Sequence, residues 1–415
     1  MTDGTVIAYD LYVPDGQPPA GGWPGVIALH GLGGSKDQMA PVAAVLATQG
    51  YAVLAYSARG EGTSTGDLTL AGPPEISDER AMFDFFAGLP AVSDTQIGVW
   101  GISYGGGEAW DGMAAGIPYK AAEVVDTWTD LYSALWPQNV AKSGIVLALL
   151  QALEARSPLL RDAAGDALHS TNLGGIKALA DARSPLSKLG TITTPVYMFQ
   201  GRVDYTFDAN QALNGFLHVG GPKHLYIGQF GHAPATFPGP DVTYVLTQGL
   251  AWFDHYLKGV PNGIDVSPPV TIAAASGPGS ASFAGLPSTR TVDVRLPGSG
   301  TTRVGPRLTA PVETFGASVL RVRVRRLHAY PRLVATVTAG GHVITDGAVV
   351  PHVGLNSIRL ADYVQYVPKG ARLTVRLGAS SAGGDPTYLG FAGRGTISLG
   401  TASLALRTLT RTISG

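Results

Sequence analysis

Short apolar segments alternate with amphipathic ones along roughly the first 260 residues, and this alternation limits the folds open to the chain more than any other feature. The apolar segments are short and several end at glycine, as strands buried on both faces do. They lie at residues 25–31, 51–56, 97–100, 121–125, 196–200 and 224–227. Segments between them, such as 39–49 and 242–257, carry apolar residues at helical spacing. The pattern predicts a parallel sheet with helices on both faces.

Two changes of texture divide the chain further. Helical spacing without strand signals fills residues of about 127–190, which we interpret as a helical cap inserted into the α/β domain. After Gly263, short alternating runs rich in Thr and Val predict an all-β sandwich. A chain of 415 residues also exceeds what one hydrophobic core usually supports. We therefore expect an α/β domain over residues 1–262 and a β-sandwich domain over residues 263–415.

The segment Gly101-Ile102-Ser103-Tyr104-Gly105 follows the strand predicted at 97–100 and opens a predicted helix. A serine in such a sharp turn has strained backbone angles, so its neighbours have to be glycine. The turn lifts the hydroxyl clear of the sheet, as it does for the nucleophile of α/β-hydrolases. An ordinary strand–helix turn is the alternative in a chain with 56 glycines, but the flanking strand and helix favour Ser103 as a nucleophile.

A serine hydroxyl needs a base, and in this fold the acid and then the histidine follow the serine along the chain. Asp204 comes just past the strand at 196–200, and His232 lies in the loop after the strand at 224–227. We therefore predict a triad of Ser103, Asp204 and His232, in which the histidine titrates near pH ~6.5–7. Weaker candidates lie in predicted helices or at a strand start: Asp208, His218 and His224.

The glycine-rich segment at residues 30–34 follows the first of the buried strands. An α/β-hydrolase places one donor of its oxyanion hole there, and the other donor is the amide after the nucleophile. The expected donors are the backbone N–H groups of Leu32 and Tyr104, and a glycine turn without a ligand is the alternative. We expect His30 to orient the loop, since no second ligand stands beside it at metal spacing. No metal and no cofactor are expected.

Three aromatic residues spaced by four, Trp128, Tyr132 and Trp136, lie in the predicted cap. They are candidates for substrate contact, although an aromatic stripe at helical spacing is more often part of a core. Asp126 and Asp130 lie in the same stretch and are the acids available to hold a substrate ammonium group. The aromatic residues and the apolar run at 145–150 instead predict an apolar pocket, which suits an acyl chain.

Charge and composition exclude several classes of partner. Lys and Arg number 29 and Asp and Glu number 30, so no strong field attracts nucleic acid or an anionic membrane. The chain has no cysteine, which excludes disulfides and thiolate chemistry. No apolar stretch reaches the ~18 residues that span a bilayer, and no signal peptide is recognisable at the N-terminus. We expect either a secreted protein whose signal peptide is missing from this sequence or a cytoplasmic protein, and the oligomeric state stays open.

Together these residues resemble the X-Pro dipeptidyl-peptidase/cocaine-esterase-like group of α/β-hydrolases. The resemblance rests on Asp3-Gly4-Thr5, Arg59-Gly60-x-Gly62-x-Ser64-x-Gly66, Gly101-x-Ser103-Tyr104-Gly105-Gly106, Gly201-x-x-Asp204 and Gly231-His232. It implies a hydrolase domain, a helical cap and a C-terminal jelly-roll-like sandwich. Two positions depart from the group: Ser57 replaces an Asp, and no oxyanion tyrosine follows the early strand.

The predicted function is hydrolysis of a small-molecule or polymer carboxylic ester through an acyl-enzyme on Ser103. Within the hydrolases, the alternatives are an X-Pro dipeptidyl-peptidase, an amidase and a polyester hydrolase. Outside the enzymes, the alternative is a non-catalytic protein whose sandwich domain binds glycans or a polymer, against which the predicted triad counts.

Overall fold

The structure is a computed structural model that describes residues 1–153, 156–390 and 395–414. Its first part is a nine-stranded sheet in the order β1-β3-β2-β4-β5-β6-β7-β8-β9. Neighbours from β3 to β8 pair in parallel, and the edge strands β1 and β9 pair antiparallel. The strands are β1 (Tyr9–Tyr12), β2 (Trp23–Leu29), β3 (Ala52–Tyr56), β4 (Val92–Ile102), β5 (Ala122–Val125), β6 (Val196–Gly201), β7 (Lys223–Gly228), β8 (Val270–Ala273) and β9 (Ser280–Phe283).

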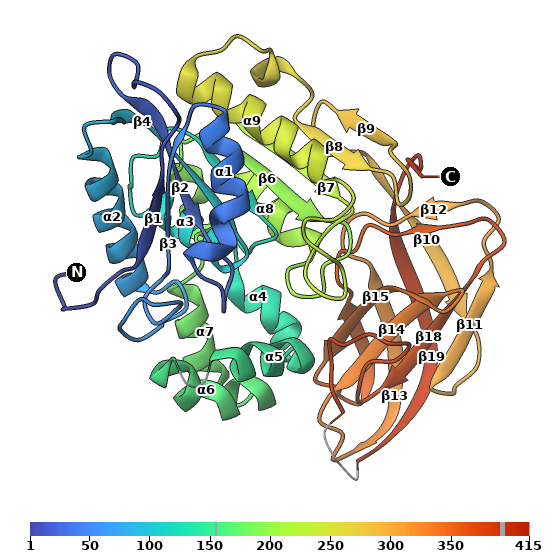
Figure 1. Cartoon of the computed structure of the whole chain (residues 1–415). Coiled ribbons are helices and arrows are strands. Elements are labelled where there is room, and N and C mark those ends of the chain that lie inside the picture. Colours follow the sequence, from blue (N-terminus) through green and yellow to red (C-terminus); the bar gives the residue numbers. More distant parts are fainter. Residues whose placement is uncertain (154–155, 391–394, 415) are drawn as a thin grey trace.

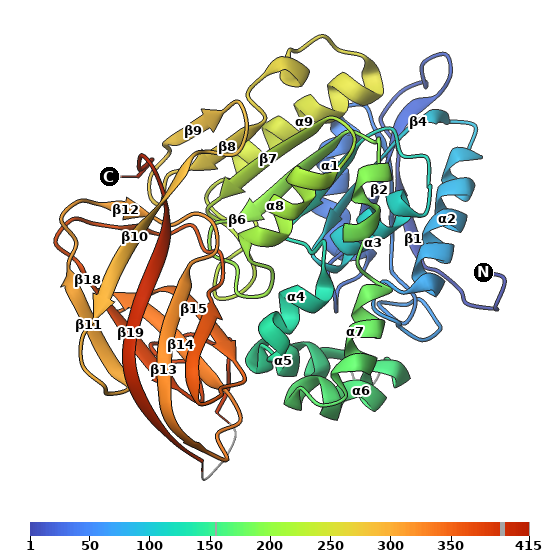
Figure 2. The same cartoon turned by 180° about the vertical axis from the view of Figure 1, so that it is seen from behind.

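Helices cover both faces of this sheet. On one face lie α1 (Ala40–Thr48) and α9 (Val242–Lys258), which bury Leu46 and Phe253 against it (Figure 1). The other face is covered by α2 (Pro73–Ala87), α3 (Tyr104–Ala114) and α8 (Ala209–His218) (Figure 2). The apolar strand runs are buried on both sides for this reason, and the predicted α/β-hydrolase arrangement is confirmed.

A helical cap follows the carboxyl end of β5, where the sequence predicts it. It consists of α4 (Leu131–Leu135), α5 (Ser143–Leu153), α6 (Pro158–His169) and α7 (Leu173–Asp181). Asp130 and Ser157 cap α4 and α6 by accepting the backbone N–H of the residue three positions on.

Four 3₁₀ helices lie along the described residues of the whole chain: η1 (Lys36–Met39), η2 (Pro137–Asn139), η3 (Leu186–Thr191) and η4 (Ile264–Val266). Among the helices that the structure describes, none has the length and apolar character to cross a bilayer.

The C-terminal part forms two four-stranded antiparallel sheets, in the orders β10-β19-β13-β16 and β11-β18-β14-β15. Leu320 and Leu404 of the first sheet share one core with Leu333 and Val375 of the second, so the sheets pack face to face. The jelly-roll connection stays a prediction. The strands are β10 (Thr289–Leu296), β11 (Thr302–Arg307), β12 (Val312–Glu313), β13 (Val319–His328), β14 (Leu333–Ala339), β15 (His342–Val349), β16 (Gly354–Arg359), β17 (Tyr366–Val367), β18 (Arg372–Gly378) and β19 (Thr396–Leu409).

The first sheet extends beyond the boundary predicted at residue 262. β8 pairs in parallel with β7, with Val270 opposite Leu225, and β9 adds one antiparallel strand at the edge. The expected division at 262/263 is therefore too early for the sheet. These two strands are not identified from the sequence, and only the tertiary structure decides which sheet they join.

The sandwich holds the segment that leads into Asp204. Arg202 is 4% exposed, and its Nη2 lies 2.5 Å from Glu313 Oε1. The Arg202 carbonyl accepts the N–H of Val364 at 2.7 Å, so both ends of this residue bind the C-terminal part. Glu313 is fully buried and also accepts the N–H of Ile413 at 2.6 Å. These contacts fix the end of β6 between the sheet and the sandwich.

Replacing Glu313 by alanine should destabilise the protein by about 3–5 kcal/mol, because it leaves the Arg202 charge buried without its partner. Differential scanning calorimetry of the purified variant measures the effect. The matched control is Asp181→Ala, which removes the exposed pair with Lys177 and should cost less than ~1 kcal/mol. Equal changes in the two variants would contradict the role given to the buried pair.

Candidate active site

Ser103 occupies a strained turn between β4 and α3. Its backbone has φ 54° and ψ −114°, and its N–H donates to the carbonyl of Val125 at 2.8 Å. A Cβ at Gly101 would stand 2.3 Å from the carbonyl oxygen of Gly105, and one at Gly105 would stand 2.4 Å from that of Leu29. Both glycines of the motif are therefore required by close backbone contacts. The half-buried serine lies at the carboxyl end of its strand.

His232 and Asp204 lie on the same edge of the sheet, in the loops that follow β7 and β6. His232 Nε2 is 2.8 Å from Ser103 Oγ, and His232 Nδ1 is 2.6 Å from Asp204 Oδ2. The histidine side chain is 24% exposed, whereas the aspartate is fully buried. The structure thus brings the three residues predicted from the sequence into one hydrogen-bonded series, in the arrangement that activates a serine.

The carboxylate of Asp204 is saturated with donors. Its Oδ1 accepts the N–H of Thr206 and of Phe207 at 2.8 and 2.9 Å, and its Oδ2 also accepts the N–H of His232 at 3.1 Å. Burial alone would raise the pKa of this carboxyl, but the charge and hydrogen bond of His232 outweigh it, so the pKa is lowered. Asp204 is thereby held as a carboxylate that orients the imidazole.

The same pairing moves the pKa of His232. Burial favours the neutral imidazole, but the charge and the hydrogen bond of Asp204 outweigh it and raise the pKa to about 9. The pKa of His232 predicted from the sequence, about 6.5–7, is therefore too low.

Activity should rise with pH through the pKa of His232, because only the neutral imidazole can take the serine proton. Since that pKa is raised to about 9, the rise should continue above neutral pH. The measurement is kcat/KM between about pH 5 and 10, with the stability of the protein checked at each pH. A profile that is flat from about pH 5 to 8 would rule out a histidine base with this pKa.

The loop after β2 lies near Ser103, since a Cβ at Gly31 would lie 3.7 Å from the Cβ of Ser103. Hydrogen bonds engage the N–H groups of Gly31, Gly33 and Gly34, but within the described residues none engages that of Leu32. Tyr104 is the first residue of α3, where amides have no intrahelical acceptor. Tyr104 directly follows Ser103 in the chain and Leu32 follows Gly31, which lies near Ser103, so both predicted donors stay candidates for an oxyanion hole.

Side chains that sequence reasoning did not single out hold this loop. Gln38 accepts the Gly31 N–H at 3.0 Å, and Glu61 accepts the Gly33 N–H at 2.5 Å. His30 Nε2 accepts the N–H of Ala58 at 3.0 Å, so this histidine orients the loop as predicted. Gln38 and Glu61 lie in other segments of the chain, and no local motif connects them with the glycines.

The predicted aromatic wall is largely part of the cap core, and this prediction is corrected. Trp128 and Trp136 are 2% and 6% exposed, and their indole N–H groups donate to the carbonyls of Arg183 and Ala167. Tyr132 stacks on Trp136, with ring centroids 6.1 Å apart. Only Tyr132 of the three lies within a helix, because α4 begins at Leu131 and ends at Leu135, so the spacing by four does not mark one helical face. The aromatic ring that contacts the candidate triad is Phe207, whose centroid lies 5.3 Å from that of His232.

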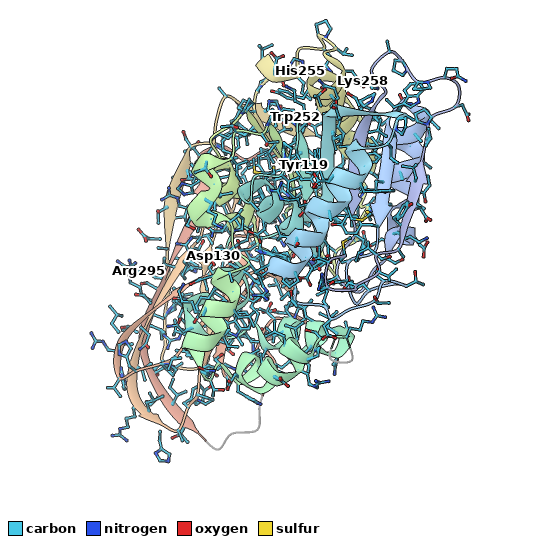
Figure 3. The ribbon with its side chains drawn as sticks, turned by 90° about the vertical axis from the view of Figure 1, so that its left-hand side faces the viewer. Tyr119, Asp130, Trp252, His255, Lys258 and Arg295 are labelled. Atoms are coloured by element: carbon cyan, nitrogen blue, oxygen red, sulfur yellow. The ribbon has the colours of Figure 1, made fainter. Side chains whose placement is uncertain are left out.

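The two acids considered for binding an ammonium group have other surroundings. Asp126 is 2% exposed and accepts the Gly201 N–H at 2.6 Å. Burial and the nearby Asp204 raise the pKa of Asp126 well above the ordinary value, which favours its protonated form. Asp130 caps α4 and lines a polar cavity of about 280 Å³, toward the sandwich (Figure 3).

A parallel sheet covered by helices, with a serine on a strained turn at the carboxyl end of a strand, defines a serine hydrolase of the α/β-hydrolase class. The chain matches the X-Pro dipeptidyl-peptidase (S15) family over residues 3–234, more than half of its length. It belongs to this family, and the resemblance noted from the sequence is confirmed.

Solved structures share the fold over nearly the whole chain. A CocE/NonD family hydrolase from Staphylococcus aureus has a TM-score of 0.75 at 14% identity, covering 99% of this chain and 92% of that one. An aminopeptidase from a marine sediment Thaumarchaeota archaeon has a TM-score of 0.75 at 12% identity, covering 99% and 95%. An alpha-amino acid ester hydrolase has a TM-score of 0.72 at 12% identity, covering 99% and 93%.

A curated relative is similar over a shorter segment. An uncharacterized protein of Pseudomonas aeruginosa is 32% identical over 133 residues, which are 31% of this chain and 35% of that protein. The matched segment therefore spans about a third of the relative's length.

Proposed function

We propose that the protein hydrolyses carboxylic esters through an acyl-enzyme on Ser103. The observation that supports this most is the hydrogen-bonded series from Ser103 Oγ through His232 to the buried Asp204 carboxylate. His232 takes the serine proton while the serine oxygen attacks the ester carbonyl, and then returns it to the leaving alcohol. The oxyanion accepts hydrogen bonds from the amides of Leu32 and Tyr104, and water activated by His232 releases the acid.

Apolar side chains around the nucleophile favour an acyl group without charge. Tyr104, Tyr205 and Phe207 share a hydrophobic cluster with Leu32 and Val203. Asp126 is 2% exposed, and the raised pKa of its carboxyl disfavours a carboxylate that would pair with a substrate ammonium group. Desolvating an ammonium group without a paired carboxylate is costly, whereas an acyl chain gains from the same surroundings.

A second candidate, cleavage of an X-Pro dipeptide from a free N-terminus, is favoured by one observation. The polar cavity between the cap, α8 and the sandwich brings together Asp130, Asp208 and Asp346. Lys142 forms part of its wall and donates to the carbonyls of Tyr205 and Thr206, just after Asp204. Both an ester hydrolase and an aminopeptidase occur among the solved structures with this fold, so the fold is compatible with either substrate.

The ester p-nitrophenyl butyrate should give a larger kcat/KM than Ala-Pro p-nitroanilide. An alkoxide or phenoxide leaves more readily than an amide nitrogen, which has to be protonated as it leaves. Each rate is corrected with the Ser103→Ala variant, which removes hydrolysis at other sites. Asp130→Asn should leave ester cleavage unchanged.

A larger kcat/KM for the anilide would overturn the ester proposal. If Asp130→Asn then abolished cleavage of the anilide alone, the acids of the polar cavity would be assigned to the substrate ammonium group.

A further inference from the structure

A second cavity, of about 280 Å³, lies between α1 and α9 on the face of the sheet opposite α3 (Figure 1). Trp100 and Ile102 of β4 and Glu123 of β5 contribute to its lining, together with residues of both helices. Its lining residues include none of the candidate triad. Leu246 and Leu250 are only half-buried, so the cavity opens to solvent between the helices.

The lining is apolar except at Gln38 and Glu123. Figure 3 labels three other residues of α9, Trp252, His255 and Lys258. The face of this helix toward the cavity is formed instead by Val242, Val245, Leu246, Gly249, Leu250 and Phe253. Such a surface gains free energy when it is covered by an apolar chain, at about 25 cal/mol per Å².

Glu123, on β5, is the acidic residue in the lining of this cavity. It is 3% exposed, and within the described residues its Oε1 has no hydrogen-bond partner. Tyr51 donates its hydroxyl hydrogen to Asp254 at 2.7 Å rather than to Glu123. A Cβ at position 249 would lie 2.5 Å from Glu123 Oε2, so glycine on α9 leaves the carboxyl its room. An unpartnered buried polar group is costly unless something else satisfies it.

Burial raises the pKa of Glu123 well above its ordinary value, which favours the uncharged carboxylic acid over the carboxylate. Such an acid both donates and accepts one hydrogen bond. A hydroxyl matches it in both respects without adding charge. An ammonium group would require two charges to be buried together, whose attraction often fails to repay their desolvation.

We propose that this cavity binds an uncharged medium-chain alcohol, whose hydroxyl group bonds to Glu123 and whose chain lies between α1 and α9. The probe is 1-octanol, an uncharged alcohol with an apolar chain for the cavity of about 280 Å³. The site is independent of the ester hydrolysis proposed for Ser103.

The test is equilibrium dialysis or calorimetry of 1-octanol with the whole protein. We expect saturable binding to one site, weakened about 10-fold in Glu123→Leu, which removes the hydrogen bond. Glu123→Gln should keep the binding, because an amide also donates and accepts. Leu246→Trp should abolish it by filling the cavity. The matched control is Leu217→Trp. Leu217 is 57% exposed and lies on α8, the helix that covers the other face of the sheet.

Four results would overturn the proposal. The first is that the wild-type protein does not bind 1-octanol. The second is that Leu246→Trp leaves the binding unchanged, which would place the alcohol outside this cavity. Octane binding as tightly as 1-octanol would show that Glu123 takes no part. Octylamine is included as the cationic probe, and tighter binding of octylamine that Glu123→Gln abolishes would assign the site to a cation instead.

Discussion

Replacing Ser103 by alanine should lower kcat by at least about 10³-fold, and toward ~10⁶-fold if the residues act as one unit. The substitution removes one hydroxyl from a half-buried position at the tip of a turn and keeps the Cβ. The close contacts that shape the turn come from the neighbouring glycines, so the fold should not change. The measurement is kcat on the best ester, together with the melting temperature of each protein.

The control separates loss of activity from loss of stability. Ser157 caps α6, and its Oγ accepts the Leu160 N–H at 3.2 Å. Ser157→Ala should cost about 1 kcal/mol of stability while the folded protein keeps its kcat. If Ser103→Ala retained more than about a thousandth of wild-type activity, the nucleophile would have to be another group.

Replacing Asp204 by asparagine should lower kcat/KM by about 10⁴-fold. Both carboxylate oxygens accept hydrogen bonds, from the Thr206 and Phe207 amides on one side and from His232 on the other. An asparagine NH₂ group therefore faces a donor in either orientation, and the imidazole loses the partner that fixes its tautomer. Without the aspartate charge the pKa of His232 should also fall, so the residual activity should reach its plateau at lower pH.

Asp126→Asn is the matched control for this change. Asp126 is buried and the pKa of its carboxyl is raised, which favours the protonated form, so an amide of the same shape changes little of its charge. We expect kcat/KM within about 10-fold of wild type and an unchanged pH profile. An equal loss in both variants would mean that the two acids share the orientation of His232.

The candidate triad could be predicted because its signals are local. Ser103 lies in a five-residue motif between a strand and a helix, and Asp204 and His232 each directly follow an apolar strand run. Strand ends of a parallel sheet meet at one edge, so chain order was enough to bring the three residues together. The His232 pKa was missed, because it depends on the burial of the Asp204 carboxylate.

Contacts between distant segments could not be predicted. No sequence signal assigns β8 and β9 to a particular sheet, yet they extend the first sheet rather than the sandwich. Trp128 has the spacing of a pocket wall, but its ring fills the space left by Gly107, where a Cβ would lie 2.2 Å from the indole. The hydrogen bond from the Gly33 N–H, in the loop after β2, to Glu61 joins residues 28 positions apart. None of these has a local sequence signal.

Labelling with a fluorophosphonate probe tests the central claim most directly, since the probe reacts with a serine only when a base activates it. The protein is incubated with the probe, digested, and the modified peptide is identified by mass spectrometry. The structure predicts one adduct, on Ser103, that is lost in Ser103→Ala and strongly slowed in Asp204→Asn. No adduct in the folded wild-type protein, or one on another residue that persists in Ser103→Ala, would contradict the account.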